Sequence, residues 1–392
     1  MSALATLDRA ALKAALEQLG ADAWLIFDFH GLNPVAARML ALGGMGTRRL
    51  FVMLPRSGKP VAVAHKIEMQ PLEGFPGTIV PYARWQELHE ALKPLVAGKT
   101  VAMEISADDA VPYLDRVPWG VVGLLQRLGA KVVSSAPLVT RFAAGWTAGE
   151  LEDHLYAAEA LAEIARAALA RAVKAGGSGL RETVLQREVI AAMESRGLKL
   201  TTPPIVGFGA NAANPHYEPE EGKDAELREG DVVLLDLWGG RGSTTTVFAD
   251  QTWMGFAGSR VPAEVEKVWR TVRDARDAAI TALREGVAAG RPVCGYELDR
   301  AARGVITEAG YGDYFVHRTG HSIDRDLHGS GPHLDDYETH DDRQLQTGVG
   351  FSVEPGIYLT GRFGVRSEVN VHLGPKGPQV TPAEPQVDLI VP

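Results

Sequence analysis

The residues best suited to chemistry lie in one stretch, from residue 315 to residue 369. Several histidines recur within residues 317–328, and two glutamates, Glu354 and Glu368, follow in apolar segments that resemble strands. A glutamate in such a segment would be costly to bury unless it were paired or coordinated a metal ion. Two of them in one region indicate a bound cation. The stretch is therefore typical of one half of a metal centre that holds two ions.

Two aspartates earlier in the chain supply the expected other half. A buried strand over residues 231–238 carries Asp236 near its end, and its predicted antiparallel partner, residues 245–254, carries Asp250. The two aspartates are 14 residues apart, as are Glu354 and Glu368. We expect the four carboxylates to face a single site.

Four carboxylates and one histidine form an oxygen-rich set of ligands. Such a set suits Mn²⁺ or Co²⁺, allows Zn²⁺, and excludes soft thiolate chemistry. Two divalent ions would nearly balance the four negative charges. Ions about 3.5–4 Å apart share a hydroxide and polarise a carbonyl oxygen at the same time. The residues therefore predict amide hydrolysis with two divalent ions, of which Mn²⁺ is the favoured one.

The composition restricts the partners and the location. The net charge is -9, and acidic and basic residues are interspersed, whereas a nucleic-acid surface needs clustered lysine and arginine. No apolar run approaches the ~20 residues that cross a bilayer, and the N-terminus lacks the layout of a secretion signal. The single cysteine, Cys294, fits a reducing compartment. We expect a cytoplasmic protein that binds neither nucleic acid nor membranes.

Hydrophobic periodicity divides the chain into two predicted domains. Residues 1–145 alternate between helices and strands, which predicts a smaller α/β domain. Its helices are expected at 7–19, 85–96 and 119–128, and its strands at 24–27, 49–54, 61–64, 78–80, 101–105 and 131–134. Residues 146–392 predict an α+β domain that begins with the capping box Thr147-Ala-Gly-Glu150. Its helices are expected at 148–175, 182–196, 262–287 and 295–308, and its strands at 204–208, 231–238, 245–254, 349–359 and 365–373.

Six motifs together resemble the pita-bread metallopeptidases, which include aminopeptidase P, prolidase and methionine aminopeptidase. The motifs are Asn211-Ala-Ala-Asn-Pro-His216-Tyr, Asp236, Ala249-Asp250-Gln-Thr, the run from His317 to His328, Val353-Glu354-Pro-Gly-Ile-Tyr358 and Val365-Arg366-Ser-Glu368. The resemblance covers residues 150–392 in detail and implies a pita-bread catalytic domain. Residues 1–145 look like the creatinase-type N-terminal domain of the proline-specific members, which methionine aminopeptidases lack. The chain looks most like the short bacterial Xaa-Pro dipeptidases.

The resemblance implies a set of metal ligands. They would be Asp236, Asp250, His321, Glu354 and Glu368, with Asp250 and Glu368 bridging the two ions. Glu354 would also help to manage the proton of the attacking water.

The resemblance also implies catalytic and substrate-binding roles. His216 and His328 would hydrogen-bond the scissile carbonyl and the tetrahedral intermediate. Arg366 would hold the bridging Glu368, and His317 would line the pocket for the proline-side residue. His333, which follows a Gly-Pro pair near the site, is a further candidate for contact with substrate.

The implied activity is hydrolysis of the Xaa-Pro bond of dipeptides through a metal-bridging hydroxide, by a homodimer. Two alternatives stay open: an aminopeptidase P that acts on longer Xaa-Pro-Xaa peptides, and a pita-bread protein without peptidase activity. The second is disfavoured because all five ligand positions are filled. A dipeptidase must also recognise a free carboxylate, for which arginine is suited. Arg48 or Arg49 of a neighbouring subunit is a candidate for that contact.

Two departures from the family pattern lie close to Asp250. Family members have a shorter connection between the two aspartates and a Gly-Tyr pair just before the second, where this chain has Gly242-Ser-Thr-Thr-Thr-Val. The usual Thr-Arg-Thr after the second aspartate is Gln251-Thr-Trp253 here. Both departures bear on substrate preference and leave the ligand set unchanged.

Overall fold

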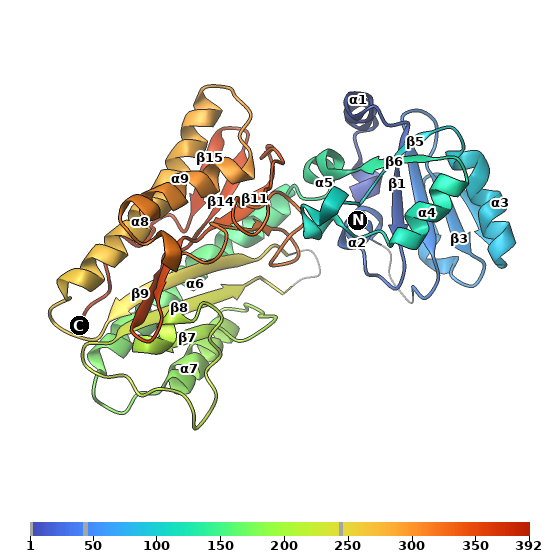
Figure 1. Cartoon of the computed structure of the whole chain (residues 1–392). Coiled ribbons are helices and arrows are strands. Elements are labelled where there is room, and N and C mark those ends of the chain that lie inside the picture. Colours follow the sequence, from blue (N-terminus) through green and yellow to red (C-terminus); the bar gives the residue numbers. More distant parts are fainter. Residues whose placement is uncertain (1–2, 42–45, 243–245) are drawn as a thin grey trace. The chain divides into compact units, whose positions relative to one another are not determined.

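The computed structural model describes residues 3–41, 46–242 and 246–392. The chain divides into two compact units, Met1–Ala144 and Gly145–Pro392 (Figure 1). Each unit has a hydrophobic core of its own. Among the described helices, none combines the length and apolar character needed to cross a membrane.

The first unit is a six-stranded mixed sheet with helices on both faces. The strands lie in the order β4-β3-β2-β1-β5-β6, with β1 antiparallel to β2 and parallel to β5. The strands are β1 (Ala23–Asp28), β2 (Leu50–Pro55), β3 (Val61–His65), β4 (Thr78–Tyr82), β5 (Thr100–Met103) and β6 (Lys131–Ser134). The helices are α1 (Arg9–Leu19), α2 (Pro34–Leu40), α3 (Trp85–Val96), α4 (Trp119–Arg127) and α5 (Ala136–Phe142). The predicted strands and longer helices are confirmed here, whereas the short α2 and α5 were not predicted.

Alternation along the strands separates two cores in this unit. Side chains of consecutive strand residues point to opposite faces of a sheet. Trp24 and Ile26 of β1 therefore pack with residues of α1, α2 and α5. Leu25 and Phe27 pack with residues of α3 and α4.

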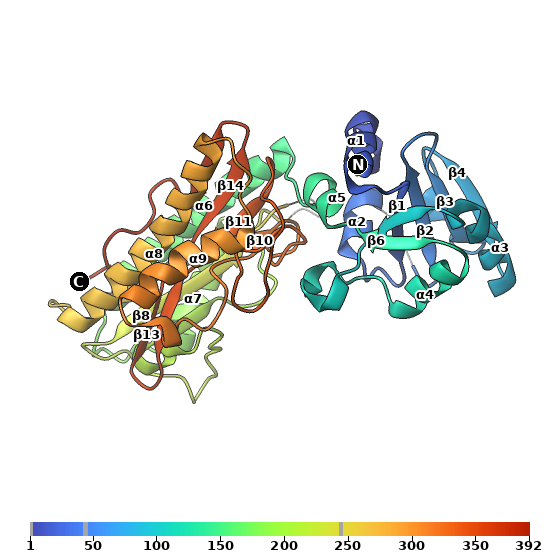
Figure 2. The same ribbon diagram turned by 45° about the horizontal axis from the view of Figure 1, so that its top comes forward.

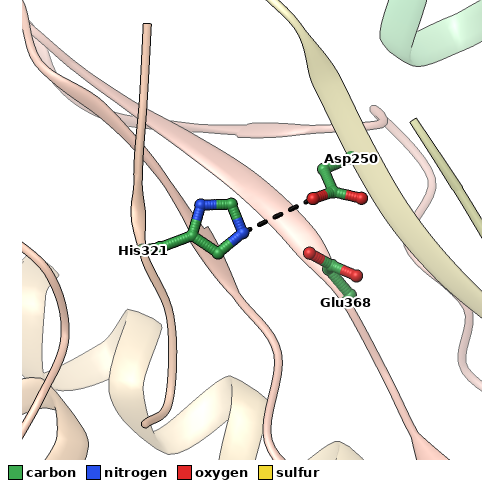
Figure 3. A group of neighbouring side chains, drawn as sticks. All are labelled: Asp250, His321 and Glu368. Carbon is green, nitrogen blue, oxygen red and sulfur yellow. Dashed lines mark ion pairs between the residues drawn. The ribbon is translucent and has the colours of Figure 1, made fainter. Parts of the chain in front are cut away.

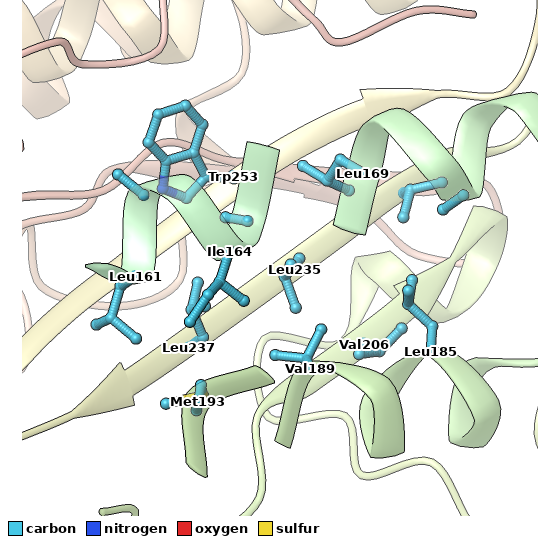
Figure 4. Packing of buried hydrophobic residues seen from close by; sticks show 14 of the residues in the cluster. Leu161, Ile164, Leu169, Leu185, Val189, Met193, Val206, Leu235, Leu237 and Trp253 are labelled. Atoms are coloured by element: carbon cyan, nitrogen blue, oxygen red, sulfur yellow. The ribbon is translucent and has the colours of Figure 1, made fainter. Parts of the chain in front are cut away.

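The second unit begins with two helices packed on a three-stranded sheet. The long helix α6 (Ala148–Lys174) starts at the predicted capping box, in which Thr147 and Glu150 exchange hydrogen bonds. It packs with α7 (Glu182–Ser195) against β7 (Ile205–Phe208), β8 (Val232–Gly239) and β9 (Ala249–Phe256). Figure 4 shows Leu161 and Leu169 of α6 and Val189 of α7 gathered over Leu235 and Leu237 of β8. This packing fixes the two strands that carry Asp236 and Asp250.

The rest of the unit places two further helices over a second group of strands. Helices α8 (Ala263–Ala288) and α9 (Gly295–Glu308) lie side by side in both views (Figures 1 and 2). A four-stranded sheet has the order β10-β11-β14-β15, and β12 pairs with β13. These strands are β10 (Ser322–Ile323), β11 (Gly350–Val353), β12 (Gly356–Leu359), β13 (Phe363–Arg366), β14 (Val369–Gly374) and β15 (Gly377–Thr381).

The two groups of strands meet beside Asp250. The backbone N–H of Glu368 donates to the carbonyl of Thr252 at 3.3 Å. The side chain of Asn370 accepts from the N–H of Asp250 at 2.9 Å and donates to its carbonyl at 2.7 Å. The residues that hold the two groups together are therefore neighbours of the predicted metal ligands.

Two predicted strands are each broken in two, and the prediction was wrong at these points. The expected strand 349–359 stops at Val353 and resumes at Gly356, because Pro355 has no N–H to continue a ladder. The expected strand 365–373 is interrupted at Ser367 and Glu368, where the backbone turns to bond Pro355 and Thr252. Glu354 and Glu368 thus sit at the two interruptions. The first residue of the expected strand 245–254, Thr245, lies outside the described residues, and β9 begins at Ala249.

Candidate metal centre

Three of the five predicted ligands converge on one buried point. Asp250 lies on β9, His321 directly precedes β10, and Glu368 directly precedes β14. One ligand atom from each lies within 4.8 Å of the other two. Figure 3 shows the imidazole ring turned toward both carboxylates. All three side chains are buried.

The imidazole of His321 faces two carboxylates. Burial opposes protonation of the ring, but the contacts with Asp250 and Glu354 prevail and raise the pKa of His321. Its Nδ1 atom lies 3.1 Å from the carbonyl oxygen of Ser322, so Nδ1 carries the hydrogen of that bond. Its Nε2 atom lies 3.4 Å from Oδ2 of Asp250 and 3.3 Å from Oε1 of Glu354. A nitrogen lone pair facing two anionic oxygens is unfavourable unless a proton or a metal cation lies between them. The fourth predicted ligand, Glu354, therefore borders the same point.

The fifth predicted ligand, Asp236, is held by Arg366. The guanidinium group of Arg366 contacts Oδ2 of Asp236, and its Nε donates to the hydroxyl of Thr252 at 2.8 Å. That hydroxyl donates to Oε2 of Glu368, also at 2.8 Å. The expected contact between Arg366 and Glu368 thus runs through one intervening hydroxyl group, and Asp236 is the direct partner of the arginine.

Three buried carboxylate oxygens near this point have no hydrogen-bond partner within the described part of the chain. They are Oδ1 of Asp236, Oδ1 of Asp250 and Oε1 of Glu368. Buried polar atoms in native proteins are nearly always paired, so such a group needs an explanation. Oxygen-rich sites with an imidazole nitrogen bind divalent cations such as Mn²⁺. The residues present therefore fit a bound divalent metal.

Four largely buried carboxylates lie close together in this site, and their burial and mutual repulsion shift their pKa values. Burial, and then the charges of Asp250 and Glu354, raise the pKa of Asp236 to about 7 against the opposing charge of Arg366. Burial also raises the pKa of Asp250, and raises that of Glu368 well above its usual value. Burial opposes ionisation of Glu354 too, but the charges of His321 and Arg366 prevail and lower its pKa. A cation placed among these groups would relieve the repulsion.

His317 and Tyr358 form one wall beside the carboxylates. Nδ1 of His317 donates to the carbonyl of Arg318 at 2.7 Å, so Nε2 accepts from the hydroxyl of Tyr358 at 2.8 Å. Burial lowers the pKa of His317 to about 4, which keeps the ring neutral at neutral pH. The ring has a fixed tautomer and orientation as a result.

The two predicted catalytic histidines lie at the exposed side of the site. The His328 ring stands nearly perpendicular to the His321 ring, with centroids 4.3 Å apart. One side of His328 meets solvent, yet packing of the rest of the ring against protein lowers its pKa to about 3, with a further contribution from the charge of His321. His216 is exposed and follows Pro215, whose carbonyl accepts from Arg366 at 3.4 Å.

His333, a predicted substrate contact, lies buried next to Ser322. Its side chain is only 1% exposed. Its Nδ1 accepts from the backbone N–H of Ser322 at 3.0 Å. This geometry favours a supporting role behind His321, and contact between His333 and substrate stays a prediction.

Sequence reasoning missed three polar side chains that orient the ligands. Thr252 links Arg366 to Glu368, and Asn370 brackets the backbone of Asp250. The hydroxyl of Ser352 accepts from the N–H of His321 and donates to Oε1 of Glu354, both at 2.9 Å. Each lies two residues from a predicted ligand in sequence, and alternation along a strand places such residues on the same face. That spacing was the available indication.

Comparison with known proteins identifies the family. The model of metallopeptidase family M24 matches residues 156–375, which is more than half of the chain and includes every predicted ligand. The chain belongs to metallopeptidase family M24. M24 peptidases depend on divalent metals, in agreement with the ligand geometry.

Individual relatives within the M24 family carry the names of dipeptidases. The Mycobacterium tuberculosis protein named probable dipeptidase PepE is 28% identical over 330 residues, which span 82% of this chain and 80% of that protein. The Xaa-Pro dipeptidase of Lactobacillus delbrueckii subsp. lactis is 34% identical over 203 residues, which span 50% of each. The crystal structure of dipeptidase PepE from Mycobacterium ulcerans is 25% identical, covers 98% of this chain and 96% of that one, and has a TM-score of 0.74. The predicted α+β pita-bread fold is confirmed.

Gln251 and Trp253, two of the residues that depart from the M24 pattern after Asp250, lie on the face of β9 that points away from the metal centre. The side chain of Gln251 donates to the carbonyl of Ala158 on α6 at 2.8 Å, and Trp253 donates to Gln251 at 2.8 Å. These two residues belong to the packing against α6, whereas Thr252 faces the site. Part of the other departure, residues 243–245, lies outside the described residues.

Proposed function

We propose that this chain is a metal-dependent dipeptidase that hydrolyses the Xaa-Pro bond. The observation that carries the proposal is the convergence of Asp250, His321 and Glu368 on one buried point, where carboxylate oxygens of Asp250 and Glu368 have no hydrogen-bond partner among the described residues. Membership in M24 supports peptide hydrolysis. The choice of Xaa-Pro dipeptides is supported by the similarity to the Lactobacillus enzyme, which spans half of each chain.

The proposal includes two divalent ions, with Mn²⁺ favoured over Co²⁺ and Zn²⁺. Asp236, Asp250, His321, Glu354 and Glu368 would hold them, with Asp250 and Glu368 between the two. When bound, such a pair supplies a bridging hydroxide at neutral pH and polarises the scissile carbonyl. Arg366 would neutralise part of the carboxylate charge, because it is permanently protonated and is fixed to Asp236 and Thr252.

The remaining roles follow from protonation states and positions. A neutral His328 keeps one N–H, which would donate to the carbonyl oxygen as negative charge develops there. His216 would act beside it. Glu354 would help to manage the proton of the attacking water, because its carboxylate borders the same point as His321. The neutral, fixed ring of His317 would line the pocket for proline.

The substrate is tested with peptides of two lengths. Enzyme stripped with a chelator is assayed with an Xaa-Pro dipeptide and an Xaa-Pro-Xaa tripeptide, with and without added Mn²⁺. The proposal predicts cleavage of the dipeptide alone, and only with metal. Cleavage of the tripeptide would assign the chain to aminopeptidase P, and cleavage of neither by the metal-loaded protein would refute peptidase activity on prolyl substrates. The homodimer and the cytoplasmic location stay predictions.

A further inference from the structure

A partly buried ion pair on α9, between Asp299 and Arg303, contacts the segment that carries His317 and His321. Arg303 donates to both carboxylate oxygens of Asp299, from Nε at 2.9 Å and from Nη2 at 3.0 Å. Oδ1 of Asp299 also accepts from the backbone N–H of Thr319 at 2.9 Å and from its hydroxyl at 2.7 Å. Asp299 and Thr319 are completely buried. The pair is thus bonded directly to a residue between the two histidines.

Arg303 uses the rest of its guanidinium on the same segment. Nη1 donates to the carbonyl of Phe315 at 2.9 Å, and Nη2 donates to the carbonyl of His317 at 2.7 Å. The group lies 4.1 Å from the centroid of the Phe315 ring and 4.3 Å from that of Tyr337. All three guanidinium nitrogens have partners. A lysine at this position would keep the charge but lack the planar fork that reaches several acceptors at once.

The opposite edge of this segment is bonded to β11 and to Glu354. The carbonyl of Thr319 accepts from the N–H of Glu354 at 2.7 Å. The N–H of Ser352 donates to the carbonyl of His321 at 2.8 Å. Between them, a Cβ atom on Gly320 would lie 2.0 Å from the carbonyl oxygen of Ser352, so only glycine permits this close approach. Residues 317–321 are held on one side by α9 and on the other by β11.

We propose that Asp299 and Arg303 are positioning residues that set the geometry of the metal centre and of the proline pocket. Through Thr319 the pair fixes the backbone of His321 and Glu354, and through Arg303 it fixes the carbonyl of His317. The inference rests on the proposed function for the role of His317. A buried ion pair adds little net stability compared with apolar residues of similar volume. The hydrogen bonds to Thr319 and His317 indicate that this pair orients the ligand segment and does not serve stability alone.

Two substitutions separate the two halves of the proposal. Thr319→Val removes the hydroxyl that bonds Asp299. Loss of a direct partner of a metal ligand weakens metal binding by about 10–100-fold, and the hydroxyl of Thr319 is one step further out, so we expect a loss of up to about 10-fold. Arg303→Lys keeps a positive charge beside Asp299 but releases the carbonyl of His317, so we expect a higher KM for the dipeptide. Because Asp299 still has a cation beside it and still bonds Thr319, the Mn²⁺ affinity should stay within about twofold of the wild type. Arg270→Lys is the matched control, because Arg270 pairs with Glu266 at the same i,i+4 spacing on the solvent-facing side of α8.

Two measurements on the metal centre do not depend on enzyme activity. Mn²⁺ affinity of the metal-free protein is measured by calorimetry, and the visible absorption of the Co²⁺-loaded protein reports ligand geometry. Thr319→Ser keeps the hydroxyl and is expected to restore both. If Thr319→Val binds Mn²⁺ as tightly as Thr319→Ser, or if Arg303→Lys has the KM of Arg270→Lys, the proposal is overturned. If the wild type cleaves no prolyl peptide, the proposed function fails, while the metal measurements still decide the role of Asp299.

Discussion

Replacement of Thr252 by valine tests the polar network behind the ligands. Valine has nearly the same shape but lacks the hydroxyl that accepts from Arg366 and donates to Glu368. Thr252 is 1% exposed, so water cannot substitute at either bond. A buried polar group left without a partner costs about 1–3 kcal/mol, and more when it is charged. Two such groups predict a loss of about 2–6 kcal/mol in the free energy of unfolding of the metal-free protein.

The same substitution is expected to weaken Mn²⁺ binding by about 10–100-fold, because Glu368 loses the bond that orients it. Unfolding is followed with guanidinium chloride, and binding is followed by calorimetry. The matched control is Thr271→Val, which removes one hydroxyl bond to the carbonyl of Lys267 on α8, far from any ligand in sequence. That control is expected to cost about 1 kcal/mol and to leave binding unchanged. Equal stability and equal affinity of the two variants would refute the reasoning.

Three further predictions concern catalysis, pH and metal. Glu354→Ala is expected to lower kcat by at least about 10²–10⁴-fold with an unchanged circular dichroism spectrum, and retained activity would remove Glu354 from the mechanism. Burial lowers the pKa of His154 to about 4 from 6.5, so the unfolded chain binds its proton first as pH falls. This stability is complete above pH 6.5 and declines by about 2 kcal/mol at pH 5 and about 3 kcal/mol near pH 4. The difference in unfolding free energy between wild type and His154→Gln should show this slope, and parallel curves would contradict it. Added Mn²⁺ at about 100 times its dissociation constant should stabilise the wild type by about 2.7 kcal/mol for each ion bound, whereas Asp250→Asn should show a clearly smaller shift in Tm.

The sequence indicated the four carboxylates of the candidate site, because carboxylates within apolar strand patterns are hard to explain by packing. The resemblance to a known family added His321, and the structure brings Asp250, His321 and Glu368 together. The sequence did not predict that the strands stop at Glu354 and Glu368, because the apolar pattern continues through both strand breaks. Pro355 indicated the first interruption, but only the pairing of Glu368 with β9 explains the second. Strand alternation gives the face of a residue and does not give its partner across a sheet.

The same limit applies to the charged groups around the site. Arg366 was expected beside Glu368 because alternation along one strand puts both side chains on the same face, yet its direct partner is Asp236, which lies on another strand. On α9, Asp299 lies 18 residues and Arg303 lies 14 residues before His317, and the pair has an ordinary i,i+4 spacing. Nothing in that spacing distinguishes a solvated pair from a buried one, so only the structure reveals its contacts.

The most direct test of the account is a titration of the chelator-stripped wild type with Mn²⁺ while Xaa-Pro dipeptide hydrolysis is measured. The account predicts negligible activity without metal and a rise that saturates at two equivalents of Mn²⁺ per chain. Full activity of the stripped protein, or saturation at two equivalents in a variant that carries both Asp250→Asn and Glu368→Gln, would contradict it.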